Sequence, residues 1–98
     1  MREQIQELRI FNNSYLVKQA LNKLVYDNKA HDVVVDKDKT EVKIMTSFHE
    51  YYVRLKALNE ERVNNLIGYY PDIVYIDKGV IDRNKWVKFF SQKGALIW

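Results

Sequence analysis

Residues 32–45, DVVVDKDKTEVKIM, are the stretch that we expect to decide the fold. The three consecutive valines are β-branched and favour an extended strand. The segment TEVKIM alternates polar and apolar side chains with the period of a second strand, and the charged residues DKDK supply the turn between the two. We therefore predict a β-hairpin in which Val42 and Ile44 face the core. Glu41 and Lys43 then face away from it.

Helices are predicted before the hairpin. Apolar residues recur at helical spacing over residues 3–11, although a strand over residues 8–11 is the competing prediction. Residues 14–26 have a continuous apolar stripe, which is typical of a helix packed on a core. The Asn-Asn-Ser cluster at residues 12–14 can cap this second helix by accepting a backbone N–H.

A helix, a strand, a further helix and an edge strand are predicted after the hairpin. Residues 47–50, SFHE, match a capping box and predict a long helix that ends near Ile67. The short apolar run IVYI at residues 73–76 predicts a buried strand. Asp82 is expected to cap the last helix, and residues 95–98 to add an edge strand.

The predicted fold is a single α+β domain over residues 1–98, because 98 residues have room for one hydrophobic core. We expect a small mixed sheet of three to four strands with flanking helices, in the order α-α-β-β-α-β-α-β. The strand-helix-strand unit over residues 41–76 would then form a right-handed crossover.

Composition restricts the classes of function. The chain is 47% hydrophobic, has a formal net charge of +3 and has no cysteine. It therefore has no disulfide or thiolate site, and no apolar run approaches the roughly 20 residues of a membrane span. We expect a cytoplasmic protein inside a host cell, with no membrane partner. Abundant Lys, Asn, Ile and Tyr suggest an AT-rich genome and a small phage or mobile-element protein.

A short acidic and basic pattern lies within the hairpin. Asp32, Glu41 and Lys43 match the spacing Asp…Glu-x-Lys, and in this respect the chain resembles the PD-(D/E)XK superfamily of nucleases and Holliday-junction resolvases. The resemblance implies that Asp32 and Glu41 bind Mg²⁺, and that Lys43 orients or deprotonates the attacking water. It also implies that Glu7 supplies an extra carboxylate from the first helix. The alternative is an ordinary solvated hairpin face, with Glu41 and Lys43 as cross-strand charge partners.

Basic and aromatic residues raise a second prediction, a surface for nucleic acid. The cations lie in the hairpin turn and on the last helix: Lys37, Lys39, Arg83, Lys85 and Lys88. Seven tyrosines, four phenylalanines and two tryptophans include rings that can stack on unpaired bases. The alternative is that these cations form the solvated faces of amphipathic helices.

Aromatic residues in the second half of the chain raise a third prediction, a protein interface. Tyr69, Tyr70 and Trp98 are candidates because exposed aromatic residues are enriched at the centres of interfaces. The alternative is that the tyrosines lie at the edge of the core with their hydroxyls in water.

These observations together predict a non-catalytic binding or regulatory module without a cofactor. Its partner is expected to be nucleic acid or a protein of the nucleic-acid machinery. The alternative is a Mg²⁺-dependent nuclease that uses Asp32, Glu41 and Lys43. Because resolvase-like nucleases are usually dimers, this alternative also implies a homodimer.

Overall fold

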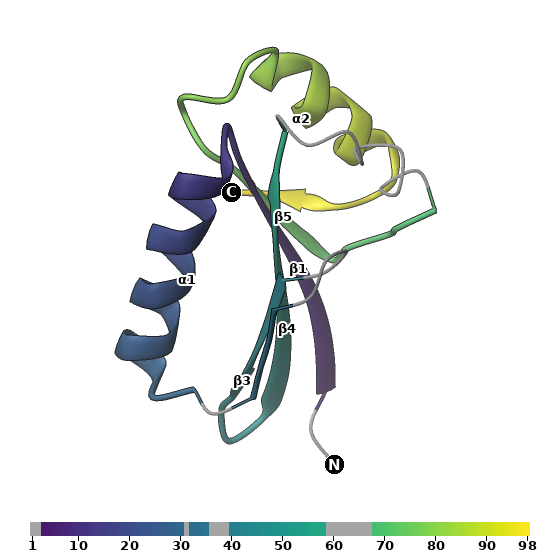
Figure 1. Cartoon of the computed structure of the whole chain (residues 1–98). Coiled ribbons are helices and arrows are strands. Elements are labelled where there is room, and N and C mark those ends of the chain that lie inside the picture. Colours follow the sequence, from purple (N-terminus) through teal and green to yellow (C-terminus); the bar gives the residue numbers. More distant parts are fainter. Residues whose placement is uncertain (1–2, 31, 36–39, 59–67) are drawn as a thin grey trace.

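The computed structural model of the chain describes residues 3–30, 32–35, 40–58 and 68–98 (Figure 1). These residues form six strands and two helices. In chain order the elements are β1 (Glu3–Phe11), α1 (Ser14–Asn28), β2 (Val33–Val35), β3 (Thr40–Met45), β4 (His49–Ala57), β5 (Ile73–Ile76), α2 (Arg83–Gln92) and β6 (Leu96–Ile97). Neither helix is long and apolar enough to cross a membrane.

All six strands join in one mixed sheet with the order β2-β3-β4-β1-β5-β6. The strands β2, β3 and β4 form an antiparallel meander, and β1 lies parallel to both β4 and β5. The last strand, β6, extends the sheet parallel to β5. The predicted α+β composition is therefore found, but the predicted sheet of three to four strands and the predicted order of elements are wrong.

The first element is a strand rather than the predicted helix. All nine residues of β1 are paired with β4, and four of them are also paired with β5. Leu8 and Ile10 point to one side of the sheet and are fully buried, while Phe11 packs on the other side. Apolar residues are needed on both sides of a central strand, and this requirement produced a spacing that imitates a helix.

The predicted helix over residues 47–67 is also wrong in its first half. Residues 46–49 turn the chain, and the Thr46 amide donates to the His49 carbonyl over 2.9 Å. Strand β4 follows and pairs antiparallel with β3, so the predicted crossover after β3 is absent. Residues 59–67 of the predicted helix lie outside the described residues.

The two helices cover opposite sides and different halves of the sheet (Figure 1). Helix α1 packs on β1, β3 and β4, whereas α2 packs on β5 and β6. One hydrophobic cluster, which we call the α1 cluster, contains Val17, Leu24, Val42 and Val53. The other, the α2 cluster, contains Leu8, Ile76 and Phe90. The side of β3 and β4 that is turned away from α1 does not pack on α2.

Several predicted elements are confirmed. The hairpin pairs β2 with β3, with Val42 fully buried under α1. Helix α1 begins after Asn13, whose side chain accepts from the Leu16 amide over 3.0 Å. Strand β5 and the edge strand β6 lie where they were predicted. At α2, however, the Asp82 side chain makes no capping hydrogen bond; its carbonyl accepts from the Lys85 and Trp86 amides, as in the first turn of any helix.

Candidate functional site

Apart from Met45, the side of β3 and β4 that is turned away from α1 carries polar side chains. Val42 and Val53 point into the α1 cluster, so their neighbours along each strand point to the opposite side. We call this surface the polar face. Its residues are Glu41, Lys43, Glu50, Tyr52, Arg54 and Lys56. Lys56 is buried and the other five are partly exposed.

The register of the meander places these side chains in rows across the strands. Asp32 lies opposite Lys43, because the Lys43 amide donates to the Asp32 carbonyl over 3.0 Å. Lys43 in turn lies opposite Tyr52, with its ammonium 5.6 Å from the centre of the ring. In the next row Arg54 lies opposite Glu41. The polar face thus alternates cations, carboxylates and aromatic rings.

Tyr52 is held between an acidic and a basic neighbour. Its hydroxyl donates to the Glu50 carboxylate over 2.9 Å. This hydrogen bond, together with burial and the negative charge of Glu50, raises the pKa of Tyr52, while the Lys43 ammonium opposes the rise. The hydroxyl therefore stays protonated at neutral pH. The contacts anchor Tyr52 beside a cation.

Arg54 and Tyr69 form a second pair of cation and ring. The Arg54 guanidinium lies 4.5 Å from the centre of the Tyr69 ring. Burial is the main cause that raises the pKa of Tyr69, and the positive charge of Arg54 opposes it. The Arg54 Nε and the Tyr69 hydroxyl are both buried without a hydrogen-bond partner among the described residues. Buried polar atoms in this state are unusual in native proteins and suit a polar ligand.

A small pocket opens at one end of the hairpin. It has a volume of about 170 Å³ and is lined by residues 28–30, Asp32 and residues 43–45. Two of the lining residues, Lys29 and Lys43, are cations, and Asp32 is the one acid among them. This balance of charge fits an anionic group better than a divalent cation.

The three residues of the predicted nuclease pattern lie on the same side of the sheet. Asp32 and Lys43 both line the pocket, while Glu41 lies one row away and does not. Asp32 and Glu41 are diagonal neighbours across the two strands, a separation of about 7–8 Å between Cα atoms. Among the described residues no cluster of three or more His, Asp or Glu side chains could hold a metal ion. The nuclease pattern stays a prediction, with two carboxylates as its ligands.

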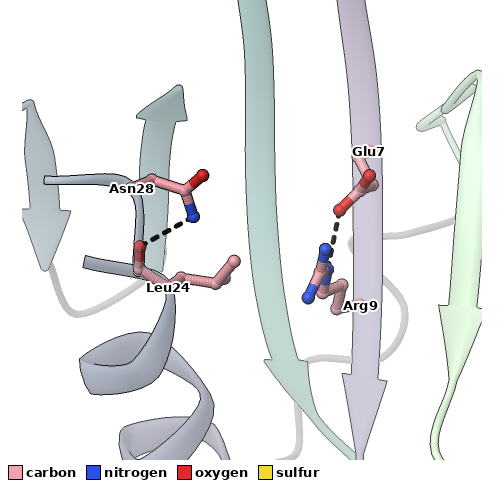
Figure 2. A network of polar contacts seen from close by, with 4 residues as sticks. All are labelled: Glu7, Arg9, Leu24 and Asn28. Atoms are coloured by element: carbon pink, nitrogen blue, oxygen red, sulfur yellow. Dashed lines mark hydrogen bonds and ion pairs between the residues drawn. The ribbon is translucent and has the colours of Figure 1, made fainter. Parts of the chain in front are cut away.

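Glu7 does not supply the additional carboxylate that the resemblance implied. It lies on strand β1 rather than on a helix, and it points to the α1 side, away from Glu41 and Lys43. Figure 2 shows its carboxylate against Arg9, with Oε2 2.6 Å from the Arg9 Nε. Because the Glu7 side chain is only 3% exposed, this ion pair explains how its charge is accommodated.

The C-terminal end of α1, beside the pocket, is capped by hydrogen bonds from residues of the helix end itself. The side-chain amide of Asn28 donates to the Leu24 carbonyl over 2.9 Å, as Figure 2 shows. Lys29 follows in the left-handed region, with φ 49°, and its backbone N–H donates to Val25. These contacts fix the position at which the chain leaves the helix, and so they fix this wall of the pocket.

The predicted cations of α2 have different roles. Arg83 Nε donates to the Ile76 carbonyl over 3.1 Å, which ties the start of α2 to the end of β5. Lys85 and Lys88 are exposed on the helix. Lys37 and Lys39 lie outside the described residues. Arg83 is therefore engaged by the fold, whereas Lys85 and Lys88 present their charges to solvent.

The predicted interface residues are also divided. Tyr70 is 68% exposed and Trp98 is 53% exposed, and both lie toward the β6 end of the sheet. The Tyr70 ring lies 4.5 Å from the Lys93 ammonium. Tyr69 is partly buried instead, because it packs on the α2 cluster and contacts Arg54 of the polar face.

Tyr52 and Arg54 were not placed on one surface of a sheet because both fell within a predicted helix. The signal that identifies them is the alternation in HEYYVRLKA, residues 49–57. Glu50, Tyr52, Arg54 and Lys56 alternate strictly with apolar residues, which is the period of a strand with one buried side. The match to a capping box at residues 47–50 favoured a helix, and the helix was predicted despite this alternation.

Comparisons with known proteins identify no relative: no family model, no curated protein and no solved structure matches this chain.

Proposed function

We propose that the chain is a non-catalytic module that binds single-stranded nucleic acid across its polar face. The observation that carries the proposal is the pairing of Lys43 with Tyr52 and of Arg54 with Tyr69 on one side of the sheet. Proteins that bind single strands combine aromatic rings, on which bases stack, with cations that contact phosphates. The exposed part of the polar face presents both kinds of group to an extended strand.

The pocket beside the polar face supports this proposal. Lys29 and Lys43 bring two positive charges to a small concave site that can accept a phosphate. Lys43 belongs to both the pocket and the polar face, so a phosphate and a stacked base can be bound together. The formal net charge of +3 is compatible with a polyanionic partner.

Binding is tested by fluorescence anisotropy with a labelled thymidine oligonucleotide, with a duplex as comparison, over a range of salt concentrations. We expect the single strand to bind more tightly than the duplex, with affinity that falls as salt rises. Tyr52→Ala should weaken binding by about 1–3 kcal/mol, because one stacked base is lost. Lys43→Gln should reduce the slope of log affinity against log salt by about 0.7, because one phosphate contact is lost.

Matched variants separate the polar face from the rest of the surface. Tyr52→Phe keeps the ring and should keep most of the affinity. Tyr26→Ala and Lys18→Gln remove exposed groups of the same kinds from α1 and should change nothing. An affinity that does not depend on salt would exclude nucleic acid and would direct the search to a protein partner.

The nuclease alternative is examined in the same samples. Asp32, Glu41 and Lys43 lie on one side of the hairpin, which is the observation in its favour. Branched, double-stranded and single-stranded DNA are incubated with the protein and Mg²⁺ or Mn²⁺. Cleavage that is abolished by Glu41→Ala would favour the enzyme. If the DNA stays intact, or if cleavage survives this substitution, the nuclease alternative is discarded.

A further inference from the structure

Within the described part of the chain, strand β2 forms one edge of the sheet and has no partner on its outer side. It is the first strand in the sheet order, and β3 pairs with it on the inner side. All three of its residues are valines, and Val34 and Val35 are 48% and 68% exposed. An apolar edge strand of this kind presents unpaired backbone groups to another chain.

The register shows which backbone groups point outward. In an antiparallel pair, residues that exchange both hydrogen bonds alternate with residues that exchange none. Asp32 and Lys43 are a hydrogen-bonded pair, so the next such pair in the register is Val34 with Glu41. Val33 and Val35 therefore direct their N–H and C=O groups away from β3, to the open side.

We propose that the chain forms a two-fold dimer in which the β2 strands of two copies pair antiparallel, with the axis at Val34. In this register Val33 lies opposite Val35 of the partner subunit, and both residues have outward groups to exchange. Val34 then lies opposite the partner subunit's Val34 at the position without hydrogen bonds. The pattern of outward groups is symmetric about Val34, so the strand is complementary to its own copy.

The side chains are suited to the same arrangement. Val33, Val34 and Val35 are β-branched, and cross-strand pairs of such residues stabilise a sheet. No charged side chain lies within the paired segment to repel its copy. An axis perpendicular to the sheet keeps both α1 helices on one side, so the sheet continues through the dimer with its buried and polar sides unchanged. Two-fold dimers are also the commonest homo-oligomers.

The other edge of the sheet does not offer an equivalent surface. At β6 the backbone amides of Leu96 and of Trp98, which follows the strand, donate to the Asp72 and Val74 carbonyls. The backbone N–H groups of these two residues therefore face β5. Ile97 alone among the residues of β6 directs its backbone groups to the open side. Opposite its own copy, one outward residue exchanges a single pair of hydrogen bonds, whereas Val33 and Val35 exchange two pairs.

The dimer is tested by sedimentation velocity across a series of protein concentrations without nucleic acid. Because two three-residue strands form a contact smaller than the roughly 1,200 Å² of stable complexes, we expect a dimer that dissociates on dilution through the micromolar range. Val34→Lys and Val34→Glu should each weaken the dimer by roughly tenfold, because like charges then meet at the axis. A mixture of the two variants should recover a heterodimer, because residue 34 of one copy faces residue 34 of the other.

A second pair of variants tests the backbone pairing itself. Val35→Pro removes an outward N–H while leaving the bonds to β3 intact, and should abolish the dimer. Val35→Thr keeps the N–H and the β-branched shape, and should preserve it. Ile97→Lys, on the opposite edge, should also preserve it. Circular dichroism checks that each variant is folded. If Val35→Pro is not folded, the mixture of Val34→Lys and Val34→Glu decides whether the two β2 strands pair.

Three results would overturn the proposal. The wild-type chain could stay monomeric throughout the concentration series. The mixture of Val34→Lys and Val34→Glu could sediment as separate monomers. Finally, Ile97→Lys could dissociate the dimer while Val34→Lys does not, which would place the contact at β6.

Discussion

In the Arg54–Tyr69 pair, burial and the charge of Arg54 have opposite effects on the pKa of the Tyr69 hydroxyl. The guanidinium is stacked 4.5 Å from the ring centre, and burial raises the pKa of the Tyr69 hydroxyl. The pair therefore keeps one cation and one neutral phenol at neutral pH, a combination that favours a stacked or anionic ligand over a metal ion.

The raised pKa of Tyr69 predicts how stability depends on pH. Its folded-state pKa lies above the ordinary value near 10, so the contribution of this group is fully present below pH 10. As pH rises above 10, the unfolded chain loses this proton first, and the free energy of unfolding falls. Tyr69→Phe cannot ionise at this position and should lose less stability than the wild type as the pH rises above about 10.

Urea denaturation at several pH values measures this difference, with each protein referred to its own stability at neutral pH. Lysines titrate in both proteins, so their effect cancels in the comparison. Parallel curves for the wild type and Tyr69→Phe would show that burial does not hold the phenol in its protonated form.

Individual elements differ in how far their local sequence predicts them. Helix α1 and strand β5 were predicted because periodicity, caps and composition agree at those positions. Strands β1 and β4 were predicted as helices because a helical spacing and a capping box gave a false local signal. For the same reason the hairpin half of the polar face was predicted, while Tyr52 and Arg54 on β4 were not placed on it.

Gly94, in the turn between α2 and β6, provides a test at the level of an element. Its φ is 89°, in the region that side chains disfavour, and no atom within 4 Å would meet a Cβ there. The cost of Gly94→Ala is therefore conformational, and we expect it to lower the free energy of unfolding by about 1–2 kcal/mol. Gly94→Asn should cost less, because asparagine tolerates this region better.

Gly68→Ala is the matched control for this measurement. Gly68 has no positive φ and also lies in open space, so its substitution should be neutral or slightly stabilising. Thermal or urea denaturation of the three variants gives the comparison. Equal losses at Gly94 and Gly68 would contradict a conformational origin.

At the scale of the molecule, the described residues form two hydrophobic clusters, one on each side of a single sheet. The α1 cluster lies over β1, β3 and β4, and the α2 cluster lies over β5 and β6. Each helix thus stabilises a different half of the sheet. This offset leaves the side of β3 and β4 away from α1 without contact to α2, and the polar face occupies it.

The separation of the clusters predicts additive effects of substitution. Ile76→Val in the α2 cluster and Ile44→Val in the α1 cluster should each lower the free energy of unfolding by about 0.5–1.5 kcal/mol. The double variant should show the sum to within about 0.5 kcal/mol, because the two sites share no partners. Urea denaturation of the four proteins measures this. A larger coupling energy would mean that strain passes through the sheet from one cluster to the other.

The amino-acid sequence by itself determined the local elements whose signals are contained in a few neighbouring residues. These are the Val33–Val35 and Thr40–Met45 hairpin, helix α1, strand β5 and helix α2. Only the tertiary structure decided that β1 lies at the centre of the sheet between β4 and β5. The physical reason is that strand pairing satisfies backbone groups between segments far apart in the chain, and no local pattern records which segments will meet. The polar face depends on that pairing, because its two cation and ring pairs come from three separate segments of the chain.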